Sequence, residues 1–177
     1  MLADTPQTYA RHVADRTKKY LDHVSLAAKD AGVACETIAL EHEHPYQGII
    51  DTVQDKGCDL IVMASHGRRG MSALVLGSET VKVLTHGKVP VLVDGSFRRG
   101  TDILKALAFG ATAVAVGRPV MWGLAAYGAD GVQGVIEMLQ TELARYMAMC
   151  GRSTLGKLDR TVLQLHGVPA ARSTSND

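Results

Sequence analysis

The fold is decided by the stretch LIVMASHGRRGMSALVLGSETVKVLTHGKVPVLVDGSFRRGTDILKALAFGATAVAVGRP, residues 60–119. It contains three short, uninterrupted apolar runs, at 60–64, 89–93 and 111–116. Such runs are typical of strands that are covered on both faces of a parallel sheet. Helical patterns at 78–86 and 101–109 separate the runs. This alternation of strand and helix predicts an α/β fold.

Upstream of this stretch, the sequence predicts two helices and a weaker strand. Apolar residues recur at helical spacing over 7–31, and Gly32 follows as a stop signal. The run 33–40 is the strand candidate, and a second helix follows over 46–56, closed by Gly57. We therefore expect a parallel sheet of about four strands in chain order, flanked by helices, either Rossmann-like or half of a TIM barrel.

Downstream, the sequence predicts a long helix over 130–150 with one apolar stripe. The stripe consists of Val132, Val135, Ile136, Leu139, Leu143, Tyr146 and Met147. We expect this helix to cover the sheet and a shorter helix to follow over 155–165. Residues 166–177 are expected to form a tail, and Met121 and Trp122 to belong to the core.

Composition bounds the possible functions. The chain has 177 residues, of which 46% are hydrophobic, enough for the core of one domain or two small ones. The formal net charge of +1 gives no long-range attraction to nucleic acid or anionic lipid. Three cysteines without C-x-x-C spacing favour a reducing compartment, and no segment reaches the roughly 18 to 20 apolar residues of a membrane span. We expect a cytoplasmic protein without a nucleic-acid or membrane partner.

Each apolar run ends in a turn rich in glycine and arginine. The carboxyl ends of parallel strands meet at one edge of a sheet, where ligands bind. The turns bring five arginines to this edge: Arg68, Arg69, Arg98, Arg99 and Arg118. Guanidinium groups bind phosphate or carboxylate through paired, charge-assisted hydrogen bonds, which predicts an anion site. The alternative is a solvated rim whose glycines only form turns.

The segment DGSFRRGTDILKALAFGATAVAVGRPVMWGLAAYGADGVQG, which begins at Asp94, resembles the final two βα units of the FMN-dependent α-hydroxy-acid oxidases and dehydrogenases, a TIM-barrel family. The resemblance covers residues 89–165. It implies that Asp94, Ser96 and Arg98 after one strand, and Gly117 and Arg118 after the next, cradle the phosphate of FMN. Ser96 departs from the family pattern, which has glycine at this position.

Residues 5–93 resemble the carboxyl-terminal half of a universal stress protein domain, a family that binds adenine nucleotides. The family's glycine signature is matched by Gly67, Gly77 and Ser78, while Ala64 stands at its first position. The family's first strands, which supply much of the adenine pocket, have no counterpart. ATP is therefore a lesser candidate than FMN. The two resemblances meet within KVPVLVDG, which suggests a chimera joined at a shared strand.

The loop His66-Gly67-Arg68-Arg69 also matches a His-Gly-x-Arg pattern of the hydroxy-acid family, in which His takes the substrate proton and Arg holds the carboxylate. This makes His66 and Arg69 tentative catalytic residues. The alternative is that the match is a coincidence, because this sequence is common in universal stress proteins. No metal site is predicted, since His42 and His44 have no visible third ligand.

Three functions remain open. The first is a binding module that holds a phosphate-bearing small molecule, FMN or an adenine nucleotide, without turnover. The second is an FMN-dependent α-hydroxy-acid oxidoreductase completed by oligomerisation, since exposed sheet edges favour a dimer or larger homo-oligomer. The third is a fusion without a ligand. In each, the parts 1–93, 94–165 and 166–177 form one continuous domain with a tail.

Overall fold

The computed structural model describes residues 6–65 and 76–164, and the chain divides into two compact units, Met1–Glu43 and His44–Asp177. The first unit contains α1 (Pro6–Asp30), which confirms the helix predicted from apolar spacing. The segment 33–40 forms no strand, so that prediction is wrong. Val33 and Leu40 are exposed there, and an extended run without a neighbouring strand gains no ladder of hydrogen bonds.

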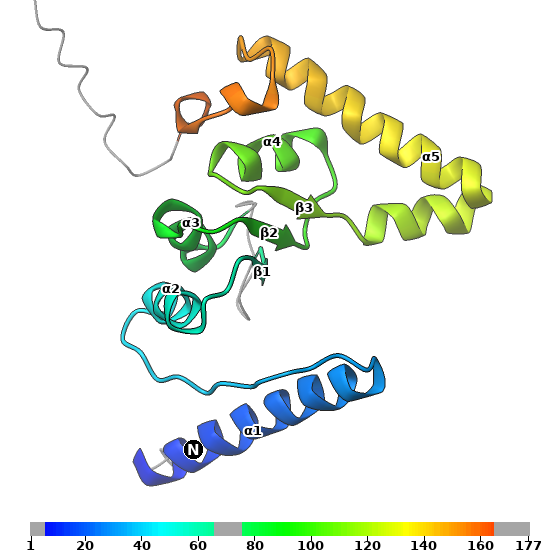
Figure 1. Cartoon of the computed structure of the whole chain (residues 1–177). Coiled ribbons are helices and arrows are strands. Elements are labelled where there is room, and N and C mark those ends of the chain that lie inside the picture. The colour runs from blue at the N-terminus through cyan, green and yellow to red at the C-terminus, as the bar shows by residue number, and fades with distance from the viewer. Residues whose placement is uncertain (1–5, 66–75, 165–177) are drawn as a thin grey trace, which may run out of the picture. The chain divides into compact units, whose positions relative to one another are not determined.

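The second unit holds a parallel sheet with the strand order β1-β2-β3 (Figure 1). Its elements are α2 (Pro45–Lys56), β1 (Ile61–Ala64), α3 (Ser78–His86), β2 (Val91–Asp94), α4 (Gly100–Ala108), β3 (Ala113–Ala115), α5 (Arg118–Met149), η1 (Leu155–Lys157) and η2 (Arg160–Val162). Ile61 pairs with Val91 and Leu92 pairs with Ala113, so β2 is the central strand. The α/β class is confirmed, and the described residues form three strands without a fourth.

The core lies around β2, the strand at which the two family resemblances meet. Val83 of α3 and Val93 of β2 are fully buried, and Phe97 just after β2 is 2% exposed. By contrast, Val62 of β1 is 64% exposed. The two-sided coverage expected from the continuous apolar runs therefore holds for the central strand and fails for β1.

A charged contact joins α2 to α3. The Glu79 carboxylate accepts a hydrogen bond from the Tyr46 backbone N–H at 3.0 Å, and Lys82 Nζ donates to it at 2.9 Å. The hydrogen bond from Lys82 is the main cause that lowers the pKa of Glu79. Desolvation opposes this lowering of the pKa, and the Tyr46 N–H adds to it.

The lowered pKa of Glu79 predicts a pH dependence of stability. A carboxyl group of this kind stabilises the fold above its unfolded pKa, near 4.5, and loses that effect as the pH falls through the lower folded pKa. Glu79→Gln should therefore lower the Tm more at about pH 7 than at about pH 3. Thermal unfolding of both proteins at the two pH values measures this. A Tm difference that is independent of pH would contradict it.

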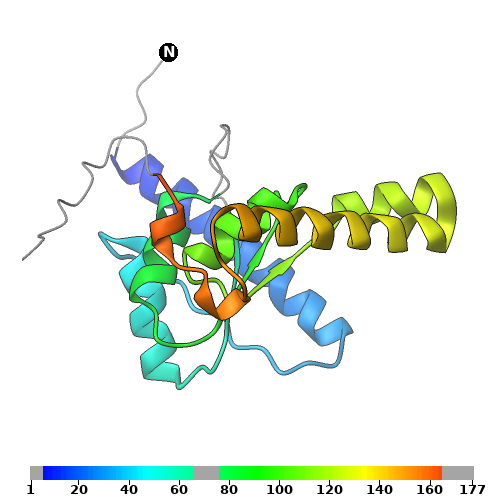
Figure 2. The same cartoon turned by 90° about the horizontal axis from the view of Figure 1, so that it is seen from above.

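Helix α5 consists of two arms joined at Tyr127 and Gly128, whose backbone angles are not helical. Figure 1 shows the two arms diverging from this junction, and Figure 2 shows both extending away from the sheet. Their backbones meet at two glycines, because a Cβ added to Gly131 would lie 2.0 Å from the Gly123 carbonyl oxygen. The helix predicted over 130–150 is the second arm of this hairpin.

The second arm packs mainly on α4, whereas the sequence analysis expected it to cover the sheet. A Cβ added to Gly100, the first residue of α4, would lie 2.4 Å from the Leu143 backbone nitrogen. The Glu142 carboxylate accepts hydrogen bonds from the Gly100 N–H at 2.8 Å and from the Arg99 guanidinium at 3.0 Å. A carboxylate is favourable here because the first turn of a helix carries unpaired N–H groups and partial positive charge.

The two short turns η1 and η2 replace the single helix expected over 155–165. The Arg160 guanidinium lies 5.3 Å from the centre of the Phe109 ring and donates a hydrogen bond to the Thr85 hydroxyl. These contacts hold η2 against the end of α3 and the residue that follows α4. The expected tail, 166–177, lies outside the described residues.

None of the helices within 6–65 and 76–164 is both long enough and apolar enough to cross a lipid bilayer.

Candidate functional site

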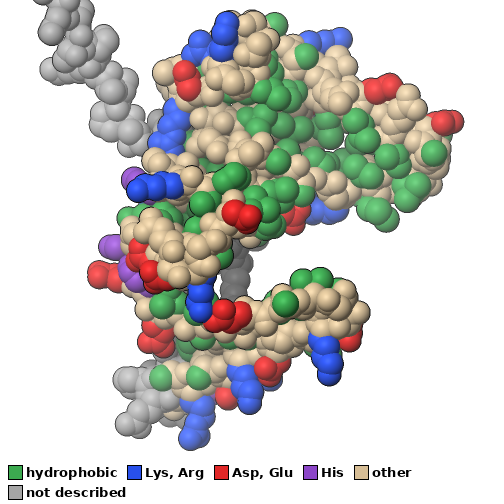
Figure 3. Space-filling view, in the orientation of Figure 1, with side chains coloured by type: hydrophobic (Ala, Val, Ile, Leu, Met, Phe, Trp, Pro, Cys, Tyr) green, Lys and Arg blue, Asp and Glu red, His purple; other side chains and the backbone are tan. Residues whose placement is uncertain are grey.

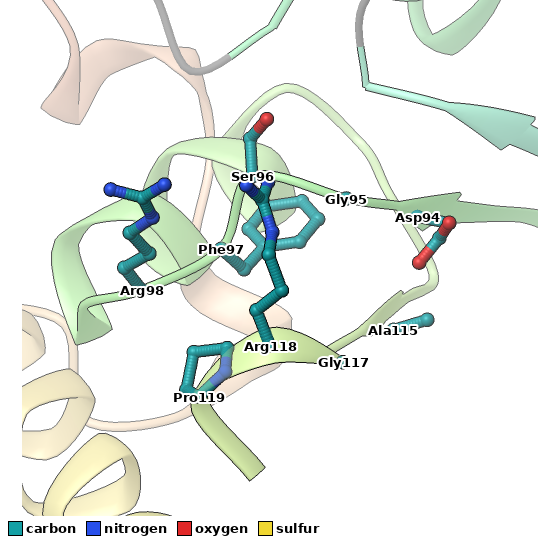
Figure 4. A pocket seen from close by; sticks show the side chains of 9 residues that line it. All are labelled: Asp94, Gly95, Ser96, Phe97, Arg98, Ala115, Gly117, Arg118 and Pro119. Atoms are coloured by element: carbon teal, nitrogen blue, oxygen red, sulfur yellow. The ribbon is translucent and has the colours of Figure 1, made fainter. Parts of the chain in front are cut away.

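A cavity of about 280 Å³ lies at the carboxyl ends of β2 and β3, between the turns that follow them (Figure 4). It is lined by Asp94, Gly95, Ser96, Phe97, Arg98, Ala115, Gly117, Arg118 and Pro119. The structure thus brings together all five residues that the sequence analysis assigned to a phosphate cradle. This edge of a parallel sheet is the usual place for a ligand in α/β proteins.

The turn after β2 has an unusual backbone. Gly95 and Ser96 both adopt the left-handed region, with φ of 89° and 69°. Phe97 is buried and anchors the turn in the core. The Asp102 carboxylate accepts hydrogen bonds from the backbone N–H groups of Arg98 and Arg99, both at 3.0 Å. The turn is therefore fixed on the side that follows Ser96, and Ser96 itself is exposed.

The turn after β3 leads directly into the first arm of α5. Gly117 is the N-cap residue, and a Cβ added there would meet nothing within 4 Å, so this side of the turn is open. Pro119 is buried and fits the first turn of a helix, where its missing N–H costs nothing. The Arg118 side chain extends from α5 toward the loop that carries Ser96 (Figure 4).

Positive charge outweighs negative charge around the cavity. The arginines Arg98 and Arg118 line it together with a single carboxylate, that of Asp94. The Arg98 guanidinium lies 5.6 Å from the centre of the Trp122 ring, which restricts where it can point. Two guanidinium groups at one exposed cavity favour an anion with several oxygen atoms.

Arg99, which the sequence analysis placed at the same rim, does not line the cavity. Its guanidinium pairs with Glu142 at 3.0 Å and so joins α4 to the second arm of α5. Arg68, together with the tentative catalytic residues His66 and Arg69, lies outside the described residues.

Gly77 and Ser78, the described part of the stress-protein signature, begin α3 and do not line the cavity. The Gly77 N–H donates to the Ser65 carbonyl at 2.7 Å, which ties the start of α3 to the end of β1. Gly67, the third residue of this signature, lies outside the described residues. Within the described ranges, no group of three or more His, Cys, Asp or Glu side chains could hold a metal ion.

Phe97, Ala115 and Pro119 also line the cavity and were not predicted from the sequence. A lone aromatic residue in the polar turn GSFRRG could have indicated the anchoring role of Phe97. The prediction that Met121 and Trp122 belong to the core is wrong, since they are 59% and 55% exposed. Both lie on the first arm of α5, where the described residues leave these apolar side chains uncovered.

Two family models match the chain. The one described as FMN-dependent dehydrogenase matches residues 50–165, and the one described as universal stress protein family matches residues 2–94. The first match begins well before residue 89, where the sequence resemblance was expected to start. Residues 50–94 therefore match both families, and the loop containing His66 lies within this shared segment.

Curated relatives and solved structures match the same region. A peroxisomal (S)-2-hydroxy-acid oxidase of Oryza sativa subsp. japonica is 47% identical over 110 residues, covering 60% of this chain and 30% of that protein. An L-lactate oxidase of Nostoc sp. is 46% identical, covering 62% and 31%. A soluble mutant of (S)-mandelate dehydrogenase from Pseudomonas putida is 34% identical with a TM-score of 0.56, covering 66% and 34%. The chain thus spans about a third of the length of the proteins it matches.

Proposed function

The chain belongs to the FMN-dependent dehydrogenase family over residues 50–165 and to the universal stress protein family over residues 2–94, and we propose on this premise that it binds the phosphate of FMN. The observation that carries the proposal is the cavity at the ends of β2 and β3, where Arg98 and Arg118 from two different turns line one space. Solved relatives include a mandelate oxidase variant with a monooxide FMN adduct.

The size and charge of the cavity support a phosphate group as the part of the ligand that is held. Its volume of about 280 Å³ is just below the roughly 300 to 1,000 Å³ that is usual for small-molecule sites. It therefore suits the phosphate end of FMN better than the whole molecule. Arg98 and Arg118 would supply paired donors to the phosphate oxygens, and Gly117 would allow its backbone close to them. When bound, FMN supplies redox chemistry through its flavin ring.

The proposal is limited to binding. The chain spans only about a third of the length of the relatives it matches. The tentative catalytic residues His66 and Arg69 lie outside the described residues. FMN is preferred over ATP because the described stress-protein residues Gly77 and Ser78 lie away from the cavity. We propose a binding module for a phosphate-bearing small molecule, in which FMN is the first ligand to test.

The sole tryptophan of the chain provides the test, because the centre of the Trp122 ring lies 5.6 Å from the guanidinium of Arg98, which lines the cavity. We expect FMN to change Trp122 fluorescence in a saturable way and inorganic phosphate to reverse the change by competition. Equilibrium dialysis with FMN gives an independent measure of binding. A protein that retains no FMN in dialysis and shows no saturable fluorescence change would contradict the proposed function.

An FMN-dependent α-hydroxy-acid oxidoreductase completed by self-association is the second candidate. The observation in its favour is the apolar surface of α5, where hydrophobic side chains gather in Figure 3. Met121, Trp122 and Tyr127 are all more than half exposed there. A dimeric mass in solution, with bleaching of bound FMN by an α-hydroxy acid, would support this candidate. A monomeric mass would count against it.

A further inference from the structure

Ser96 has a backbone conformation that a serine adopts only at a cost. Its φ is 69°, and it is the only residue other than glycine with a positive φ among the described residues. The left-handed region costs an L-residue on the order of 1 to 2 kcal/mol because its Cβ approaches the carbonyl oxygen. Glycine would avoid that cost, and the preceding Gly95 already has a φ of 89°.

The fold does not offset this cost through the serine side chain. Ser96 is exposed, so burial contributes nothing. Within the described parts of the chain, its hydroxyl makes no hydrogen bond, although serine often stabilises a turn by bonding to nearby backbone. Strained residues that persist without local compensation tend to mark ligand-binding sites.

Ser96 also lies where a hydroxyl could serve a ligand. It lines the cavity together with Arg98 and Arg118, and Arg118 extends toward its loop (Figure 4). A phosphate monoester presents three terminal oxygens, each of which can accept more than one hydrogen bond. Two guanidinium groups therefore leave some of these acceptor positions free. A hydroxyl can rotate to donate to whichever oxygen the arginines leave open.

We infer that the Ser96 hydroxyl donates a hydrogen bond to the phosphate of the ligand, and that a serine is retained at this strained position for this contact. The inference rests on the proposed function and gives the Ser96 side chain a specific role in it. Ser96 thus lowers the stability of the free protein and raises its affinity for a phosphate monoester. A serine that is only tolerated in this turn would affect stability alone.

Two variants separate these roles. Ser96→Ala keeps the strained Cβ and removes the hydroxyl, and Ser96→Gly removes both. We expect each variant to weaken binding of FMN and of inorganic phosphate by about threefold to tenfold. Only Ser96→Gly should raise the Tm, by roughly 1 to 4 °C after the entropy cost of glycine is subtracted. Ser153→Ala, which removes an exposed hydroxyl away from the cavity, should leave binding unchanged.

The outcomes distinguish this inference from the proposed function. If wild-type protein binds FMN and phosphate but Ser96→Ala and Ser96→Gly bind them as tightly, the role of Ser96 is overturned and the proposed function stands. If wild-type protein binds neither FMN nor inorganic phosphate, the proposed function fails and the role of Ser96 fails with it. The expected result is weaker binding by both variants together with a higher Tm for Ser96→Gly alone.

Discussion

Replacing Arg118 by methionine is expected to weaken FMN binding by about tenfold to a hundredfold. The guanidinium extends from the first turn of α5 across the proposed phosphate site, and methionine keeps much of the side-chain length without the charge or the donors. A hydrogen bond between charged groups contributes about 1.5 to 3 kcal/mol. Because Arg118 is exposed, the fold should be retained, and the far-ultraviolet circular dichroism and the Tm should stay close to those of wild type.

Arg145→Met provides the matched control for Arg118→Met. Arg145 is an exposed arginine on the second arm of the same helix and does not line the cavity. Arg145→Met changes the net charge of the chain by the same amount as Arg118→Met, so any general electrostatic effect on FMN binding should be equal in the two variants. Fluorescence titration of Trp122 measures both affinities. Equal affinities for FMN in the two variants would show that the cavity does not bind the phosphate through Arg118.

Replacing Gly131 by alanine is expected to destabilise the protein by about 1 to 3 kcal/mol. The added Cβ would lie 2.0 Å from the Gly123 carbonyl oxygen and 2.7 Å from its carbon, so the two arms of α5 must move apart. The neighbour is backbone, which cannot rotate away as a flexible side chain would. This overpacking outweighs the gain of roughly 1 kcal/mol that alanine normally brings over glycine in a helix.

Gly134→Ala is the control for Gly131→Ala, because it lies one turn further along the same arm and its added Cβ would meet nothing within 4 Å. It should leave stability unchanged or raise it by up to about 1 kcal/mol. Urea unfolding, followed by circular dichroism, gives the midpoints of all three proteins. If both alanine variants were stabilised alike, the close contact between the two arms would be refuted.

Local patterns predicted most of the second unit. Six elements begin and end within two residues of the predicted ranges: β1, β2, β3, α2, α3 and α4. Their bounds were predictable because apolar runs and glycine stop signals are local features of the sequence. The cavity was also predictable, since parallel strands bring the turns at Asp94 and Gly117 to the same edge.

The errors concern contacts between elements that are distant in the chain. The run 33–40 has a strand-like composition, yet a strand requires a neighbour that composition does not specify. Trp122 has the composition of a core residue but lies on a projecting helical arm. Arg99 resembles Arg98 in sequence, and only its pairing with Glu142 distinguishes their roles. The left-handed backbone of Ser96 likewise becomes evident only from the structure.

The central claim is that the cavity between the turns at Asp94 and Gly117 is a phosphate site. The most direct measurement compares the affinities of wild-type protein for FMN and for riboflavin, which carries the same ring and side chain without the phosphate. We expect FMN to bind tighter than riboflavin by about tenfold or more, because the charged contacts of Arg98 and Arg118 are made only with the phosphate. Equal affinity for FMN and riboflavin would contradict it.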